Sequence, residues 1–306
     1  MVQLGISTGL FHDHDLITHL PVIKDAGFEV IEVCLDTMEW GQRNTMEGNN
    51  SQFFMKEGLE IWQQKIHSYN LRNKLREFGV YVHSLHLPVF PELDIASLHE
   101  RTRVHAIWEF KKGIDVLDYL GGEIAIVHPS MQPFDLNNYD EKCRRLAKCR
   151  ESMQELLDYS KSKNIKLAVE NLLPHLLGGR SEDLTRLVDE LSATNLGICF
   201  DSSHANLAQD PAQVLKDFNK RVISVHLSDN HGQYDDHLIP GAGKINWPSI
   251  MSGLKDIGYR GVFMLEVFTR QENVDLGQLL EDIREQAELV LENSANNGID
   301  NVVYRL

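Results

Sequence analysis

Cysteine is scarce in this chain. Only four occur among 306 residues, and no two of them form a CxxC pair. Cys34 and Cys199 lie in apolar runs, whereas Cys143 and Cys149 lie in a basic helical stretch. This usage offers no CxxC zinc or redox motif, and it favours reduced thiols in a cytosol over a disulfide framework. We therefore expect a cytoplasmic protein.

Long hydrophobic runs are missing as well. No window approaches the roughly 18 apolar residues that a membrane span requires. The N-terminal stretch MVQLGISTGLFHDHD also lacks the charged and apolar regions of a signal peptide. We expect no signal peptide and no association with a membrane.

Positive charge is the third shortage, because 30 Lys and Arg face 45 Asp and Glu, for a formal net charge of -15. Such acidity opposes affinity for a phosphate backbone, unless a basic cleft overcomes it locally. The composition is otherwise that of a globular protein with a sizeable core, at 42% hydrophobic and 25% charged residues. A small-molecule substrate is therefore favoured over nucleic acid.

Eight apolar, β-branched runs recur along the chain and alternate with stretches of helical periodicity. The predicted strands are 4–8, 30–35, 80–88, 124–130, 166–172, 196–204, 222–229 and 261–268. Continuous rather than alternating apolar patterns indicate strands that are covered on both faces. Eight β-then-α units predict an α/β fold, a (β/α)8 TIM barrel in one domain over residues 1–306. An open doubly wound sheet is the alternative, but no GxGxxG follows the first strand.

Helices are predicted over 15–27, 100–122 and 139–163, and a last helix near 275–296 closes the ring. Two polar segments look inserted, at 36–54 after the second strand and at 229–247 after the seventh. In a barrel both segments lie on the C-terminal face, where active sites form.

Carboxylates and imidazoles stand where these apolar runs end. Six successive strand ends, with the loop after the seventh strand, supply His86, His128, Glu170, Asp201, His204, His226, Asp235, His237 and Glu266. Any one of them alone is more simply explained as a hydrogen-bonded structural residue or as one partner of an ion pair. Together they are harder to explain, because buried carboxylates without cationic partners are costly and these strand ends carry no Lys or Arg. A divalent cation would neutralise several carboxylates at once.

The donor types limit the choice of metal. Two glutamates, one aspartate and one histidine form a mostly oxygen site, which suits Mn²⁺, Mg²⁺ or Co²⁺ at least as well as Zn²⁺. The remaining imidazoles could build further, more zinc-like sites. They could also orient the ligands or contact hydroxyl groups of the substrate.

At these residues the chain resembles the xylose isomerase-like barrel superfamily, which includes sugar isomerases, ketose 3-epimerases, inosose dehydratases and isomerases, and apurinic-site endonucleases. The stretch HLSDNHGQYDDHLIPGAGKINW is similar to the sugar phosphate isomerase/epimerase group, and VENL, FDSSHAN and MLEVF support the resemblance. The epimerase branch implies one divalent metal on Glu170, Asp201, His226 and Glu266. The endonuclease branch implies three zinc ions on His86, His128, Glu170, Asp201, His204, His226, Asp235, His237 and Glu266.

The chain departs from the endonuclease pattern in three places. Only eight residues separate His226 from Asp235, and none is Arg or Lys. The cysteine-bearing DxCH motif of the endonucleases is DSSH here, and LGIST replaces the first-strand motif with its early histidine. Since phosphate contacts dominate nucleic-acid affinity, these departures argue against DNA cleavage.

The resemblance implies metal-assisted proton transfer on a sugar, sugar phosphate or polyol. One of Glu170 and Glu266 removes the proton next to a carbonyl, and the other returns a proton to the opposite face or to the neighbouring carbon. Asp201 and His226 act mainly as ligands. The alternatives are a zinc phosphodiesterase of the apurinic-site endonuclease type and an inosose dehydratase-type lyase. A homo-oligomer paired through the helical face is a further expectation.

Overall fold

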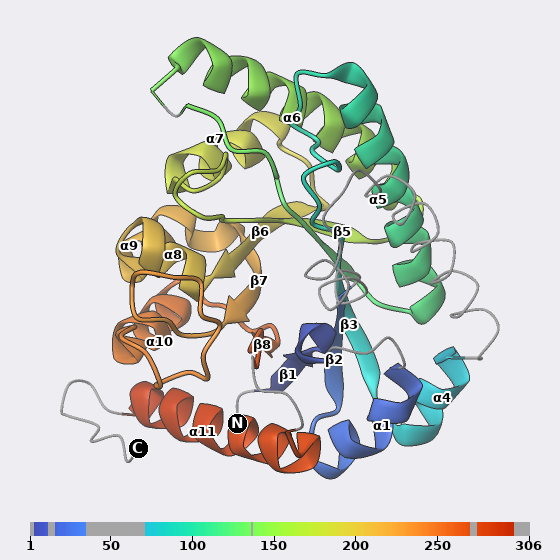
Figure 1. The fold of residues 1–306 in the computed structure, drawn as a ribbon, viewed down its shortest axis with the longest axis vertical. Helices are drawn as coiled ribbons and strands as arrows, with labels where there is room; N and C mark the ends of the chain where they lie inside the picture. The colour runs from blue at the N-terminus through green and yellow to red at the C-terminus, as the bar shows by residue number, and fades with distance from the viewer. Residues whose placement is uncertain (1–2, 12–15, 35–70, 136, 270–273, 297–306) are drawn as a thin grey trace, which may run out of the picture.

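Eight parallel strands form a closed barrel in chain order (Figure 1). The computed structural model describes residues 3–11, 16–34, 71–135, 137–269 and 274–296, so the predicted insertion at 36–54 lies outside the described residues. Strand β1 pairs with both β2 and β8, which closes the ring. The strands are β1 Leu4–Ser7, β2 Val30–Cys34, β3 Tyr81–His86, β4 Ile124–Val127, β5 Lys166–Glu170, β6 Leu196–Asp201, β7 Val222–Leu227 and β8 Phe263–Leu265.

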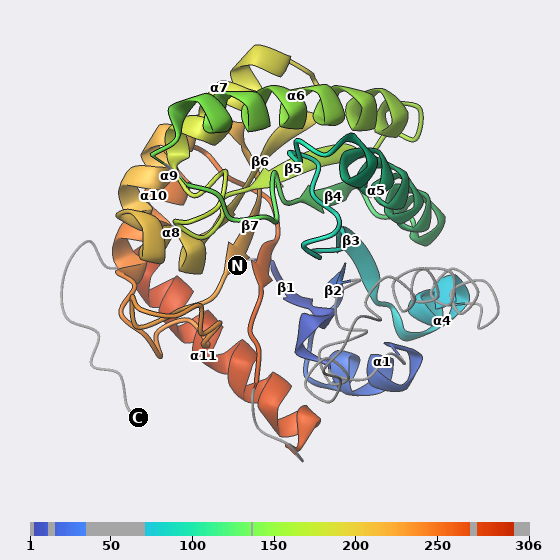
Figure 2. The same cartoon turned by 45° about the horizontal axis from the view of Figure 1, so that its top comes forward.

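Helices surround the strands, as Figure 2 shows. They are α1 Leu16–Asp25, α4 Leu71–Phe78, α5 Glu100–Leu120, α6 Tyr139–Lys161, α7 Ser181–Leu191, α8 Ser202–Ala208, α9 Pro211–Phe218, α10 Trp247–Asp256 and α11 Leu276–Asn296, with short 3-10 turns at η1 Thr8–Leu10 and η3 Asn219–Arg221. The (β/α)8 barrel predicted from the sequence is confirmed. Within the described ranges, no helix has the length and apolar character needed to cross a membrane.

The predicted strand over 196–204 ends earlier than expected, at Asp201. The Asp201 carboxylate accepts a hydrogen bond of 2.6 Å from the backbone nitrogen of His204 and thereby caps helix α8. An aspartate in this position satisfies a backbone donor that the first turn of a helix leaves free. The cap therefore ends strand β6 at Asp201, and helix α8 begins at the next residue.

Alternation along the strands separates two layers of packing. Side chains that face the helices join the main core, whereas a small separate cluster consists of Ile124, Ile126, Ala168 and Cys199. In a strand, residues two apart share a face. Glu170 therefore continues the face of Ala168, and Asp201 continues the face of Cys199. The strand alternation directs both carboxylates into the barrel.

Two register shifts bring site residues level with each other across neighbouring strands. The shift between Ile31 and Glu32 pairs Glu32 with Ser84 of β3. A second shift, between β6 and β7, pairs Asp201 with His226. Such bulges re-aim side chains next to functional sites.

Candidate metal centre

The ends of strands β5 to β8 bring four donors together. Each of Glu170, Asp201, His226 and Glu266 offers one ligand atom, and these atoms all lie within 4.8 Å of one another. None of the four residues is more than 5% exposed. The four strands are neighbours in the barrel, so their carboxyl ends converge on the C-terminal face, as predicted from the sequence.

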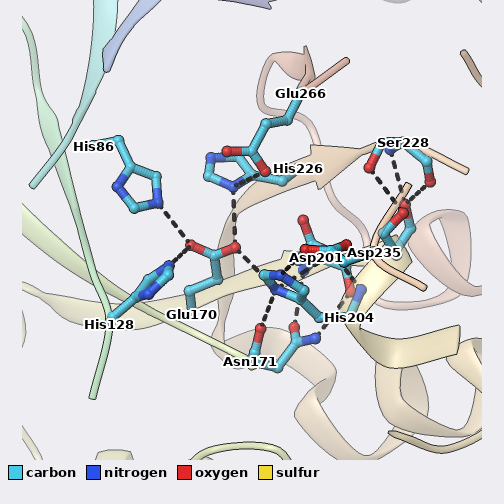
Figure 3. A network of polar contacts seen from close by, with 12 residues as sticks. His86, His128, Glu170, Asn171, Asp201, His204, His226, Ser228, Asp235 and Glu266 are labelled. Atoms are coloured by element: carbon cyan, nitrogen blue, oxygen red, sulfur yellow. Dashed lines mark hydrogen bonds and ion pairs between the residues drawn. The ribbon is translucent and has the colours of Figure 1, made fainter. Parts of the chain in front are cut away.

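Glu170 lies at the centre of this network, and histidines surround its carboxylate (Figure 3). Its Oε2 accepts from His86 Nε2 at 3.1 Å and from His128 Nε2 at 3.2 Å. Its Oε1 lies 3.3 Å from His226 Nδ1 and 3.4 Å from His204 Nδ1. Burial alone would raise the pKa of Glu170, but the charges of His226 and His128 and the hydrogen bonds hold it well below its ordinary value.

The other two carboxylates of the cluster titrate differently. Burial opposes ionisation of Glu266, but His226, at 3.2 Å, and His237 lower its pKa to about 2. Burial, opposed by His204 and reinforced by the negative charges of Glu170 and Glu266, raises the pKa of Asp201 to about 7. Among the described residues, Asp201 Oδ2 accepts no hydrogen bond although it is buried.

This donor set fits a divalent cation. Three buried carboxylates in one cluster repel one another, and the orphaned Asp201 oxygen needs a positive partner. Within the described part of the chain, the ionic partners of Glu170 and Glu266 are histidines rather than Lys or Arg. The clustered groups could therefore hold a metal, and the carboxylate-rich set suits Mn²⁺, Mg²⁺, Co²⁺ or Zn²⁺.

A second cluster borders the first and consists of His204, Asp235 and His237. Asp235 Oδ2 lies 3.2 Å from His204 Nε2 and 3.0 Å from His237 Nε2. Each imidazole is within hydrogen-bond distance of a backbone carbonyl through its other nitrogen, His204 to Asn171 at 2.9 Å and His237 to Glu266 at 3.0 Å. This is the usual arrangement of histidines that bind a metal through the remaining nitrogen. The carboxylate of Asp235 raises the pKa of His237 to about 9, against the effect of burial.

His86 and His128 complete a third cluster, with Glu170. Burial opposes protonation of His86, but Glu170 raises its pKa to about 10. Burial lowers the pKa of His128 despite the same carboxylate. All nine residues predicted as donors therefore lie in one connected network.

The backbone of His237 is strained. Its φ is 48°, in the left-handed region that residues with side chains seldom occupy. Neighbouring backbone bonds hold the conformation, since Phe268 N donates to His237 O at 3.0 Å and Leu238 pairs with Asp229 in both directions at 2.8 Å. Strain of this kind persists where surrounding structure fixes a functional side chain. The His237 ring lies 3.0 Å from Asp235 Oδ2 through Nε2.

Comparison with known proteins identifies the family. The sequence model of the xylose isomerase-like TIM barrel matches residues 20–293. The chain belongs to the xylose isomerase-like TIM barrel family. The resemblance noted from the sequence motifs is thereby confirmed.

Relatives within this family differ in activity. An uncharacterised protein of Methanocaldococcus jannaschii is 28% identical over 93% of this chain and 90% of its own length. D-psicose 3-epimerase of Enterocloster bolteae is 25% identical over 46% of each chain. Probable endonuclease 4 of Mycobacterium leprae is 23% identical over 60% of this chain and 72% of its own. The solved structure of a D-tagatose 3-epimerase-like protein aligns with a TM-score of 0.72, at 25% identity over 95% of this chain and 99% of that one.

Two polar residues of this xylose isomerase-like barrel are missing from the sequence prediction. Asn171 exchanges two hydrogen bonds with the backbone of Asp201. Its Nδ2 donates to Asp201 O at 2.9 Å, and its Oδ1 accepts from Asp201 N at 2.8 Å. Glu32 is completely buried in the middle of β2 and contacts His226 and Ser84. The signal for Glu32 was a single carboxylate within the apolar run VIEVC. Glu32 lies in the middle of its strand, whereas the predicted donors lie at or after strand ends.

The loop after β7 is organised around Asp229, which is fully buried. A Cβ on Gly243 would lie 2.2 Å from Asp229 Oδ1, so the loop closes on the carboxylate only with glycine there. This explains the GAG segment of the motif, and it fixes the loop that carries Asp235 and His237. Four groups donate to Asp229 at 2.8–3.1 Å, namely the backbone nitrogens of Asn230, Gly241 and Ile245 and the indole of Trp247.

Replacing Asp229 with Asn is expected to destabilise the protein by about 3 kcal/mol, because the amide NH₂ would face buried N–H donors instead of accepting from them. Urea unfolding followed by tryptophan fluorescence measures the change. The control is Asp236→Asn in the same loop, whose one described bond, from the backbone nitrogen of His231, is 3.4 Å long. An Asp229→Asn protein as stable as this control would show that the carboxylate does not organise the loop.

Proposed function

We propose that this protein is a divalent-metal-dependent isomerase or epimerase of a sugar, sugar phosphate or cyclitol. The observation that carries the proposal is the buried cluster of Glu170, Asp201, His226 and Glu266, which combines three carboxylates with one imidazole. Similarity to a D-psicose 3-epimerase and to a D-tagatose 3-epimerase-like structure supports a sugar as the substrate.

Glu170, Asp201, His226 and Glu266 would hold the metal. When bound, a divalent metal supplies a Lewis acid that polarises a carbonyl and favours removal of a neighbouring proton. The orphaned oxygen of Asp201 supports its role as a ligand rather than as a base.

Glu170 and Glu266 are the proposed catalytic residues. Both are buried, and nearby histidines keep both carboxylates ionised and thus able to accept a proton. One glutamate removes the proton from the carbon next to the carbonyl. The other delivers a proton to the opposite face, which inverts that centre, or to the neighbouring carbon, which moves the carbonyl.

The remaining histidines are proposed to position these groups. His86 and His128 hold Oε2 of Glu170, and His204 and His237 share Asp235. From the sequence, the imidazoles of His86, His204 and His237 could build further metal sites, orient the ligands or contact substrate hydroxyls. Because both ring nitrogens of each already face protein groups, we propose that they first orient carboxylates or hold additional metal.

A second candidate function is hydrolysis of a phosphodiester with three zinc ions. The overlapping donor groups that extend from the four-donor cluster to His86 and His128 and to Asp235 favour it, and a probable endonuclease 4 is among the relatives. Against it stands the eight-residue connection between His226 and Asp235, which contains no Arg or Lys to contact phosphate.

Metal content and a substrate screen test the proposal together. Purified protein is analysed for bound metals, then assayed with ketoses, inososes and their phosphates in the presence of Mn²⁺, Mg²⁺, Co²⁺ or Zn²⁺. We expect about one metal per chain and conversion of one sugar class with uptake of solvent deuterium at a single carbon. The Glu170→Gln protein, prepared identically, controls for contaminating isomerases.

The same preparation is assayed on a duplex with one abasic site. About three zinc ions per chain with cleavage of this duplex, and no sugar conversion, would contradict the isomerase proposal and establish the phosphodiesterase. Release of water from an inosose would instead show a dehydratase.

A further inference from the structure

Glu32 is a buried carboxylate that the proposed proton transfer does not use. It is 0% exposed and lies in the middle of β2, two residues before the strand ends. Burying a carboxylate is unfavourable unless it is paired and hydrogen-bonded. A residue kept at this cost inside the barrel is expected to act on something nearby.

Both described partners of Glu32 bind the same oxygen. Ser84 Oγ donates to Glu32 Oε2 at 2.8 Å, and His226 Nε2 lies 3.0 Å from that oxygen. The register shift that pairs Glu32 with Ser84 sets this contact. Glu32 is thus oriented by the neighbouring strand and directed at a histidine 194 residues away in sequence.

The opposite nitrogen of His226 faces the metal cluster. His226 Nδ1 lies 3.3 Å from Glu170 Oε1 and 3.2 Å from Glu266 Oε2. Glu32 belongs to none of the donor groups that could share an ion, and it contacts the imidazole through the other ring nitrogen. Glu32 is therefore placed behind His226 and not among the ligands.

We propose that Glu32 is a positioning residue that fixes the proton of His226 on Nε2, so that the lone pair of Nδ1 points at the metal cluster. This inference rests on the proposed metal site. A neutral imidazole carries one proton, and the hydrogen bond made by one nitrogen determines which nitrogen is free to bind a metal. A carboxylate as acceptor also makes the imidazole a stronger ligand.

The test compares metal affinity in wild type, Glu32→Gln, Glu32→Leu and Ser84→Ala, by titration of Zn²⁺ or Mn²⁺ against a competing chelator. Loss of the carboxylate is expected to weaken affinity by about 10–100-fold, as is usual for groups that orient metal-binding histidines. The leucine variant removes the acceptor and should have the larger effect. Ser84→Ala, which retains the carboxylate, should have a smaller one.

Glu109→Gln is the matched control. Glu109 is also buried, at 3% exposure, but it pairs with Lys112 and His105 on helix α5 and belongs to none of the donor groups that could hold a metal. Its replacement should leave metal affinity within twofold of wild type. If Glu32→Gln and Glu109→Gln lose metal affinity to a similar degree, the cause is general destabilisation and the proposal is overturned.

Nitrogen NMR of the zinc-loaded, ¹⁵N-histidine-labelled protein gives a readout independent of activity, with His226 assigned from His226→Gln. A proton on Nε2 is expected in wild type. A proton on Nδ1, or unchanged metal affinity in Glu32→Gln, would refute the positioning role while leaving the metal site intact. Wild-type protein that binds no metal would instead refute the proposed function, and the inference with it.

Discussion

Replacing Glu170 with Gln is expected to lower kcat by about 10³-fold or more, and Glu266→Gln should have a comparable effect. A positioned acid or base typically contributes about 10²–10⁴-fold, and each residue is also a proposed metal ligand. The amide keeps the shape of the side chain but cannot accept a proton. Steady-state kinetics with the substrate identified by the screen measure the loss.

Metal analysis of the same variants separates the two roles. A variant that retains its metal but loses turnover has lost a proton acceptor. A variant that loses both metal and turnover has lost a metal ligand. Exchange of the substrate proton with deuterated solvent then shows which glutamate acts on which face. Glu109→Gln, on α5 and outside the donor groups, should keep wild-type kcat. If conversion survives unharmed in both Glu170→Gln and Glu266→Gln, the two-glutamate mechanism is wrong.

Removal of the metal is expected to abolish turnover and to lower thermal stability. In the stripped protein the carboxylates of Glu170, Asp201 and Glu266 remain buried together with no divalent charge to neutralise them. A ligand present at 100 times its Kd stabilises the folded state by about 2.7 kcal/mol. Dialysis against a chelator, followed by calorimetry and by assays after readdition of single metals, measures both effects.

Acidification should release the same metal. Burial opposes protonation of His226, but the carboxylates of Glu266, Glu32 and Glu170 hold its pKa well above the ordinary value. Protons therefore compete with the metal for the His226 nitrogen. Metal affinity should rise with pH until the pH passes the pKa of His226. Titration calorimetry at about pH 6 and pH 8 detects the difference. Full turnover in the stripped protein, or equal affinity at both values, would contradict a site built on these residues.

Much of this architecture could be predicted from local sequence. The runs around Glu170 and Glu266 are apolar on both faces, which is what a parallel strand between helices and the barrel interior requires. Their polar ends could be assigned to the C-terminal face because every βα unit of a barrel presents the same edge. The nine candidate donors could therefore be named from the residues alone, and the structure brings them into one network.

The contacts among those donors could not be predicted in the same way. The partner of each histidine nitrogen depends on register shifts of single residues, such as the one that pairs Asp201 with His226. The carboxylate of Glu32 is visible within VIEVC, but its role is not. Its partner lies across the barrel on β7, and the chain order says nothing of the register at which the strands meet.

The sequence by itself determined which segments form strands and the chemistry available at their ends, because apolar runs and donor types are local properties. Only the tertiary structure decided that Glu170 is shared by four histidines and that Glu32 lies behind His226. Barrel closure and register are nonlocal. They arise when eight strands pack around one interior, and they place residues far apart in the chain within hydrogen-bonding distance.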